Sequence, residues 1–243
     1  MSRSLNEIQR LCQKAVEGAG APPDLDVEAA WGAAWLLARD LPALASLAAD
    51  LERCAELATA CRFARDALDG DTLDAGGKAG AVIAPLLTDL AVARAAQTGG
   101  PGRLQVEGLT APLFLLPAAV GHGRQGRSFH LALTAGAARH FAFRVAPGGQ
   151  ADILGDGDLA GLSDPEVTWS LEAVCGEATE QVDLPVLRSG AQLDAAVARS
   201  LAAGVTPDPE AWARLQVYAA KVLVPATEQS HRLGAGALTS DNE

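Results

Sequence analysis

Lysine, methionine and aromatic residues are scarce in this 243-residue sequence. Lys14, Lys78 and Lys221 are the only lysines, so few side chains are available for lysine chemistry and arginine carries most of the positive charge. Aromatic residues make up 4% of the chain, with one Met and one Tyr. The core must therefore be built mainly from Ala, Leu and Val, whose small side chains let helices and strands approach closely. Hydrophobic residues amount to 49%, which is enough for one large domain or two small domains packed together.

Basic clusters and long apolar runs are also lacking. The net charge is −11 and the pI is near 4.8. Binding to a phosphate backbone needs clustered Lys and Arg, so we expect no nucleic-acid partner. No apolar run reaches the ~18 to 20 residues that a membrane helix requires, and the N-terminus lacks the basic flank and apolar core of a signal peptide. We therefore expect a cytoplasmic protein with no membrane partner.

The four cysteines match no metal-binding or redox motif. Cys12, Cys54, Cys61 and Cys175 contain no Cys-x-x-Cys pair, and their spacing fits no zinc site. We expect them to be buried free thiols.

The first hundred residues have mainly helical patterns. Ser4 and Glu7 form a capping box ahead of apolar residues at helical spacing, and Gly18 ends that helix. Further helices are predicted for residues 24–41, with Val27, Trp31 and Trp35 on the apolar face, for residues 44–61, and from Pro85 through Ala93. Residues 70–80 are predicted to be a polar connection, and residues 99–102 a break. The stripe of residues 44–61 is predicted to face the core, with dimerisation as the alternative.

After Leu104 the pattern changes to the alternation typical of strands. Strands are predicted at residues 104–106, 113–116, 129–133, 141–145, 167–175 and 181–184. The second pair forms a hairpin that places His130, His140 and Arg144 on its more polar side. Two helices follow, at residues 189–204 with a second capping box and at residues 208–225. This order predicts an α+β fold, in which a helical N-terminal part precedes an antiparallel sheet flanked by C-terminal helices. We predict subdomains at residues 1–98 and 103–243 within one compact unit.

No motif predicts a cofactor or a metal. Residues 155–160 satisfy the dinucleotide pattern Gly-x-Gly-x-x-Ala, but Asp156 and Asp158 would face the pyrophosphate, and Pro165 prevents the helix that should receive it. A solvated turn is the better interpretation. His130, His140 and either Glu172 or Glu107 could converge on one face, yet their spacing is not that of a metal site. His122 lies between two glycines, which indicates either close approach of the backbone to another group or a mobile loop tip.

The last twenty residues concentrate side chains that can build a binding site. Glu228 could act as an acid or base, and Arg232 as a bidentate clamp on a carboxylate. Ligand contacts are predicted for Thr227, Ser230, the backbone of Gly234 and Gly236, and His122. The alternative is structural, with Thr227 as a helix cap and Glu228 paired with Arg232. We also predict that residues 226–243 are ordered against the body of the protein and help form its main concave site.

Both ends of the chain carry a recognisable pattern. It comprises Ser4-Leu5-Asn6-Glu7-Ile8 and Gly18-Ala19-Gly20 at the start, and Val224-Pro225-Ala226-Thr227-Glu228 and Gly234-Ala235-Gly236-Ala237 at the end. With these motifs the sequence resembles a bacterial family of unknown function, domain of unknown function 3726. The resemblance implies a single shared fold and brings no chemistry with it.

Two classes of function remain open at this point. The first is a small-molecule enzyme, a hydrolase or lyase acting on a polar or carboxylate metabolite, which the C-terminal residues favour. The second is a non-catalytic subunit or binding protein of a catabolic system, either a homodimer or docked on a protein partner. The absence of a complete nucleophile, base or metal constellation favours this second class.

Overall fold

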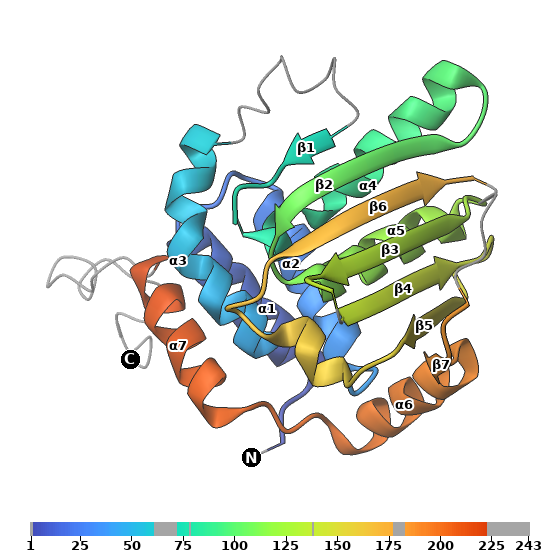
Figure 1. Cartoon of the computed structure of the whole chain (residues 1–243). Helices are drawn as coiled ribbons and strands as arrows, with labels where there is room; N and C mark the ends of the chain where they lie inside the picture. Colours follow the sequence, from blue (N-terminus) through green and yellow to red (C-terminus); the bar gives the residue numbers. More distant parts are fainter. Residues whose placement is uncertain (1, 61–71, 78, 138, 177–182, 223–243) are drawn as a thin grey trace, which may run out of the picture.

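Seven strands form one sheet in the described part of this protein, for which the computed structural model covers residues 2–60, 72–77, 79–137, 139–176 and 183–222, with residues 55–60 described by their backbone alone. The strands are β1 (Thr72–Asp74), β2 (Gly102–Leu109), β3 (Phe129–Ala135), β4 (Arg139–Val145), β5 (Ala151–Gly155), β6 (Trp169–Cys175) and β7 (Val186–Arg188). They lie in the order β1-β2-β6-β3-β4-β5-β7 (Figure 1). Neighbouring strands are antiparallel, except that β1 runs parallel to β2.

The helices precede, interrupt and follow this sheet. They are α1 (Leu5–Gly18), α2 (Leu25–Leu37), α3 (Leu44–Ala60), α4 (Gly80–Thr98), α5 (Leu115–Arg124), α6 (Gly190–Ala203) and α7 (Pro209–Ala219), with 3-10 helices η2 (Pro112–Phe114), η3 (Leu159–Ser163) and η4 (Ala220–Val222). The order of helices, mostly antiparallel sheet and helices confirms the predicted α+β class. None of the helices in the described ranges is long and apolar enough to cross a membrane.

The sheet has one apolar and one more polar face. Alternate residues of β3, β4 and β6 are buried on the apolar face: Phe129, Leu131, Leu133, Phe141, Phe143, Val145, Trp169, Leu171, Ala173 and Cys175. Helices α4 and α5 lie against this face, where α4 contacts β2 and β6 and α5 contacts β4 (Figure 1). On the other face His130 stands opposite Arg144, and His140 opposite Thr134, which confirms the predicted hairpin and its polar side.

Both predicted capping boxes are present. At α1 the Ser4 hydroxyl accepts a bond from the Glu7 N–H, and at α6 the Ser189 hydroxyl accepts one from the Gln192 N–H. Each bond satisfies an N–H that has no partner within the helix. These local patterns therefore set both helix starts correctly.

Residues 113–116, predicted as a strand, instead form the end of η2 and the start of α5. The prediction was wrong because Leu113 to Leu116 are buried on every side, and a short run that is apolar all round does not distinguish a strand from a buried helix. As a result, His122 lies in the last turn of a helix and not on a loop.

Helix α4 begins at Gly80, five residues before the predicted start at Pro85. Two tertiary hydrogen bonds hold its first turn: the Gly80 N–H donates to Thr110 Oγ1 at 2.9 Å, and the Ala81 N–H donates to Asp50 Oδ2 at 2.9 Å. These distant acceptors replace a local cap, and Pro85 lies inside the helix instead of at its start.

Smaller differences have similar causes. The connection at residues 70–80 contains β1, which pairs with β2 and was not predicted. Val27 on α2, which was assigned to an apolar face, is 45% exposed, and Leu201 on α6 is 70% exposed. Small residues such as Ala29 and Ala196 are buried instead, because alanine-rich helices pack through their smallest side.

The cysteine prediction is confirmed where the structure describes it. Cys12, Cys54 and Cys175 are buried free thiols, and burial raises the pKa of the Cys12 thiol to about 12. A thiol with so high a pKa is unreactive at neutral pH. Cys61, the first two residues of the strand predicted at residues 181–184 and the whole C-terminal stretch from residue 223 lie outside the described residues. Residues 183–184 are not in a strand, and the strand that follows them is β7, which pairs with β5. The division into subdomains stays a prediction.

Asp50 is expected to make stability depend on pH. Burial raises the pKa of this carboxyl from 3.8 to about 6, against the opposing hydrogen bonds from Ala81 and Thr110 and the charge of Arg53. The folded state therefore binds a proton more tightly than the unfolded state, and the stability that Asp50 contributes is lost as pH rises through 6. In urea denaturation, the difference in unfolding free energy between the wild type and Asp50→Ala should be larger at pH 5 than at pH 7 by about 1 kcal/mol. A difference in unfolding free energy that is smaller at pH 5 than at pH 7 would contradict the raised pKa of Asp50.

Candidate functional site

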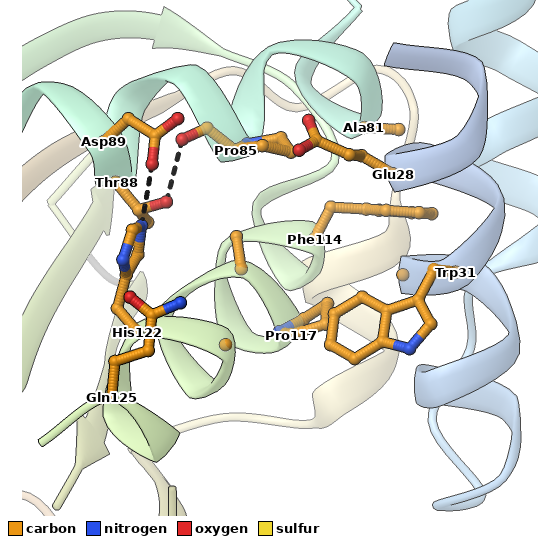
Figure 2. A pocket seen from close by; sticks show the side chains of 13 residues that line it. Glu28, Trp31, Ala81, Pro85, Thr88, Asp89, Phe114, Pro117, His122 and Gln125 are labelled. Carbon is orange, nitrogen blue, oxygen red and sulfur yellow. Dashed lines mark hydrogen bonds and ion pairs between the residues drawn. The ribbon is translucent and has the colours of Figure 1, made fainter. Parts of the chain in front are cut away.

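A cavity of about 260 Å³ opens where α2, α4 and α5 meet (Figure 2). Its lining comes from three segments: Glu28, Trp31 and Gly32 of α2; Ala81, Pro85, Thr88 and Asp89 of α4; and Phe114, Pro117, Ala118, Gly121 and His122 of η2 and α5, with Gln125 directly after α5. The first turn of α4, which Asp50 and Thr110 hold in place, supplies Ala81 to this wall. This part of the cavity wall therefore depends on the two hydrogen bonds at the start of α4.

One wall of the cavity is apolar and tightly packed. Trp31 and Pro117 face one another across its lower part, with Phe114 above them (Figure 2). A Cβ on Gly32 would lie 3.2 Å from Phe114 Cδ1 and 3.5 Å from Pro117 Cγ. Glycine at this position thus lets α2 approach the aromatic ring, which leaves a flat, apolar surface for a ligand.

The opposite wall carries an acid–base pair. His122 Nε2 lies 2.8 Å from Asp89 Oδ1, and this contact joins α5 to α4 (Figure 2). The His122 side chain is 18% exposed and that of Asp89 is 61% exposed, so the pair lies at the boundary between cavity and solvent. The ring of Phe129 packs against the imidazole, with the two centroids 5.7 Å apart. The contacts with Asp89 and Phe129 hold the imidazole beside the cavity.

Glu28 adds a second carboxyl from α2. Its pKa is raised, first by burial and then by the charges of Asp89 and Asp24, while His122 acts in the opposite direction. The charges of Asp89 and His122 thus act on Glu28 from the opposite side of the cavity mouth, on α4 and α5. No Lys or Arg side chain lines the cavity among the described residues, so its charge is negative unless a proton or a cation enters.

The two glycines that flank His122 have different roles. A Cβ on Gly123 would lie 2.8 Å from Val145 Cγ1 and 3.0 Å from Gly149 Cα, so this glycine packs α5 against the turn after β4. Gly121 lines the cavity, and a Cβ there would meet nothing within 4 Å. One interpretation of this motif was that the backbone approaches another group closely. Gly123 agrees with that interpretation, and the group it approaches is the protein's own turn after β4.

Of the predicted site residues, the structure describes His122 alone. Thr227, Glu228, Ser230, Arg232, Gly234 and Gly236 lie outside the described residues, and their roles stay predictions.

The second histidine cluster is not assembled into a metal site. His140 Nδ1 lies 3.0 Å from Asp156 Oδ2, and Glu172 pairs with Arg103 at 3.2 Å. Burial lowers the pKa of His130. Within the described ranges, no three His, Cys, Asp or Glu side chains could hold a metal ion together. In the segment 155–160, which was predicted to be a turn, Gly155 ends β5, residues 156–157 form an exposed bend, and Asp158 caps η3.

Glu28, Trp31 and Asp89 were missed by sequence reasoning. Asp89 is separated from His122 by 33 positions, and α5 was not predicted, so no spacing rule connects the two residues. One signal was present: Asp89 is the only acidic residue between residues 80 and 98, in a segment that is otherwise largely apolar. A lone carboxylate in an apolar helix is a reason to look for a functional partner.

Residues 3–67 match the family described as protein of unknown function (DUF3726). The match confirms the resemblance drawn from the N-terminal motifs and spans α1, α2 and α3. A comparison with curated proteins found no match.

Solved dehydrogenases share the fold of the chain. Malate dehydrogenase from Entamoeba histolytica aligns with a TM-score of 0.58 at 8% identity, over 93% of this chain and 99% of the other. A dehydrogenase from Sinorhizobium meliloti aligns with a TM-score of 0.60 at 14% identity, over 90% and 99%. Sulfolactate dehydrogenase from Methanocaldococcus jannaschii aligns with a TM-score of 0.55 at 10% identity, over 91% and 97%. At these identities the similarity establishes the fold and not the reaction.

Proposed function

We propose that the protein is a small-molecule oxidoreductase whose substrate binds in the cavity between α2, α4 and α5, with His122 as its proton acceptor. The single observation that carries this proposal is the 2.8 Å contact between His122 Nε2 and Asp89 Oδ1 at the cavity wall. A carboxylate that accepts the Nε2–H fixes the tautomer, so Nδ1 is left to take up a proton, and the same carboxylate stabilises the imidazolium that results. The fold shared with dehydrogenases favours oxidoreduction over hydrolysis or elimination.

The charges of the cavity indicate the class of substrate. Glu28 and Asp89 would repel a dicarboxylate, and no described Lys or Arg lines the cavity to offset them. Trp31 and Phe114 supply aromatic faces, which attract apolar groups and cations. A small alcohol or amine with an apolar part therefore fits better than malate or sulfolactate, the compounds named for two of the structural relatives.

The proposed reaction balances as a dehydrogenation. A hydride leaves the carbon that bears the hydroxyl or amino group, the proton on that oxygen or nitrogen passes to His122, and a carbonyl or imine remains. The hydride needs an acceptor of the organic redox-cofactor class. A cavity of about 260 Å³ holds a small substrate or a single ring but not a whole dinucleotide, so the cavity residues do not by themselves form a cofactor site.

A leucine at Gly121 should abolish ligand binding without harming the fold. Its side chain would enter the cavity, and a Cβ there meets nothing within 4 Å. Leucine also favours helix over glycine by up to about 1 kcal/mol, so the free protein should be at least as stable as the wild type. The purified protein is screened by thermal shift against small alcohols and amines, and each compound that binds is tested on Gly121→Leu, where the shift should vanish.

Gly161→Leu is the matched control, because a Cβ at Gly161 in η3 also meets nothing within 4 Å and that residue does not line the cavity. Its ligand response should equal that of the wild type. A Gly121→Leu protein that still binds the same compounds would place the site elsewhere. Binding that depends on the cavity but gives no turnover with any hydride acceptor would favour the non-catalytic binding protein.

A further inference from the structure

A second groove, of about 280 Å³, lies between the segment after α2 and helix α6. Three arginines line it, Arg39, Arg188 and Arg199, together with Asp40, Gln192, Ala195 and Ala196. This clustering is notable in a chain of net charge −11, whose basic residues are few. It shares no lining residue with the cavity of the proposed function.

Arg39 is held in place by its surroundings. Its guanidinium carbon lies 3.7 Å from the centroid of the Trp35 ring, and Nη1 donates to the Trp35 carbonyl at 3.1 Å. Arg39 is half-buried, whereas Arg188 and Arg199 are exposed. A guanidinium that is already stacked and hydrogen-bonded loses little conformational entropy when it binds a ligand. Its remaining N–H donors are therefore preorganised.

The charges around the groove sum to a positive value. Arg199 pairs with Asp40 at 2.6 Å. Burial lowers the pKa of Arg39, the charge of Asp194 acts in the opposite direction, and the charge of Arg124 at the end of α5 lowers it further. Among the side chains that line the groove, three arginines stand against one aspartate, which leaves two positive charges for an incoming anion. Arg188 donates to the Leu187 carbonyl and has no acidic partner within 4.0 Å in the described ranges.

We propose that this groove binds the phosphate group of a phosphorylated small molecule. Planar guanidinium forks match tetrahedral oxyanions through paired N–H donors, and several arginines can share the oxygens of one phosphate. A phosphate dianion balances the two excess positive charges from one tetrahedral group, whereas a dicarboxylate such as malate spreads the same charge over two separate planar groups. The groove is distinct from the cavity that carries the proposed function, so either assignment can fail alone.

Isothermal titration at low ionic strength provides the test, with inorganic phosphate, pyrophosphate, a nucleoside diphosphate and malate as probes. We expect the phosphorylated probes to bind more tightly than malate, and binding to weaken as salt rises. Arg188→Gln and Arg199→Gln should each weaken phosphate binding about tenfold or more. Asp40→Asn should strengthen it, because this variant removes the carboxylate that competes for Arg199. A purely structural role for Asp40 predicts no such gain.

Two controls isolate the groove. Arg10→Gln, on an exposed arginine of α1, removes the same charge elsewhere and should leave the affinity unchanged, as should His122→Asn in the cavity. The proposal is overturned if none of the phosphorylated probes binds, if malate binds as tightly as pyrophosphate, or if Arg188→Gln and Arg10→Gln have equal effects. Thermal unfolding of each variant verifies that a lost affinity is not a lost fold.

Discussion

Replacing Asp50 by alanine should lower the free energy of unfolding by about 2 to 4 kcal/mol at pH 7. The carboxylate is 1% exposed and accepts hydrogen bonds from the Ala81 N–H at 2.9 Å and the Thr110 hydroxyl at 3.0 Å, with Arg53 at 3.2 Å. Alanine would leave the buried Ala81 N–H, at the start of α4, without this acceptor. Removing a buried charge returns part of that loss, since burial disfavours the ionised carboxyl. Urea denaturation followed by circular dichroism measures the difference.

The Asp50→Ala substitution should also affect the cavity, because Ala81 lines its wall. Amide exchange in the first turn of α4 should therefore accelerate in Asp50→Ala relative to the rest of the chain. Asp194→Ala, on an exposed carboxylate of α6, is the matched control and should change stability by less than about 0.5 kcal/mol. If both variants lost the same free energy of unfolding, the hydrogen bonds of Asp50 would contribute no more to stability than an exposed carboxylate does.

The sequence predicted those elements whose signals are local. Capping boxes at Ser4 and Ser189 specify two helix starts, and strict alternation specifies the hairpin of β3 and β4. Prediction failed where long-range contacts decide the structure. The early start of α4 depends on acceptors that lie 30 and 31 residues away in the sequence, and the run of residues 113–116 becomes helical inside the core.

Long-range contacts also explain why the sequence predicted only one residue of the candidate site. His122 was singled out, but its partner Asp89 lies on another helix, and Trp31 lies on a third. Spacing rules detect residues that share one element and not residues that tertiary packing brings together. A cavity lined from three helices is therefore invisible to local patterns.

His122→Asn should lower the rate of the proposed reaction by about 10²- to 10⁴-fold, which is the range that a positioned general base supplies. Asparagine retains a polar group of similar reach but cannot take up the proton. We therefore expect kcat to fall and KM to change little, since the loss affects the chemical step. The reaction is followed with a compound whose binding Gly121→Leu abolishes, together with an added hydride acceptor.

His130→Asn is the matched control, because that histidine lies on the polar face of the sheet, opposite Arg144. Its rate should stay within about twofold of the wild type, in line with the small effects expected of residues outside a site. If His122→Asn kept full activity while its thermal unfolding matched the wild type, His122 would not be the base.

The most direct test of the account is a double-mutant cycle between His122 and Asp89, with kcat/KM as the readout. The two atoms in contact lie 2.8 Å apart, so the residues are expected to act as one unit. Asp89→Asn and His122→Asn should each reduce kcat/KM by at least about 10²-fold, and the double variant should be little slower than His122→Asn alone. Losses that multiply independently, or an Asp89→Asn enzyme as fast as the wild type, would contradict the claim that this pair performs the chemistry.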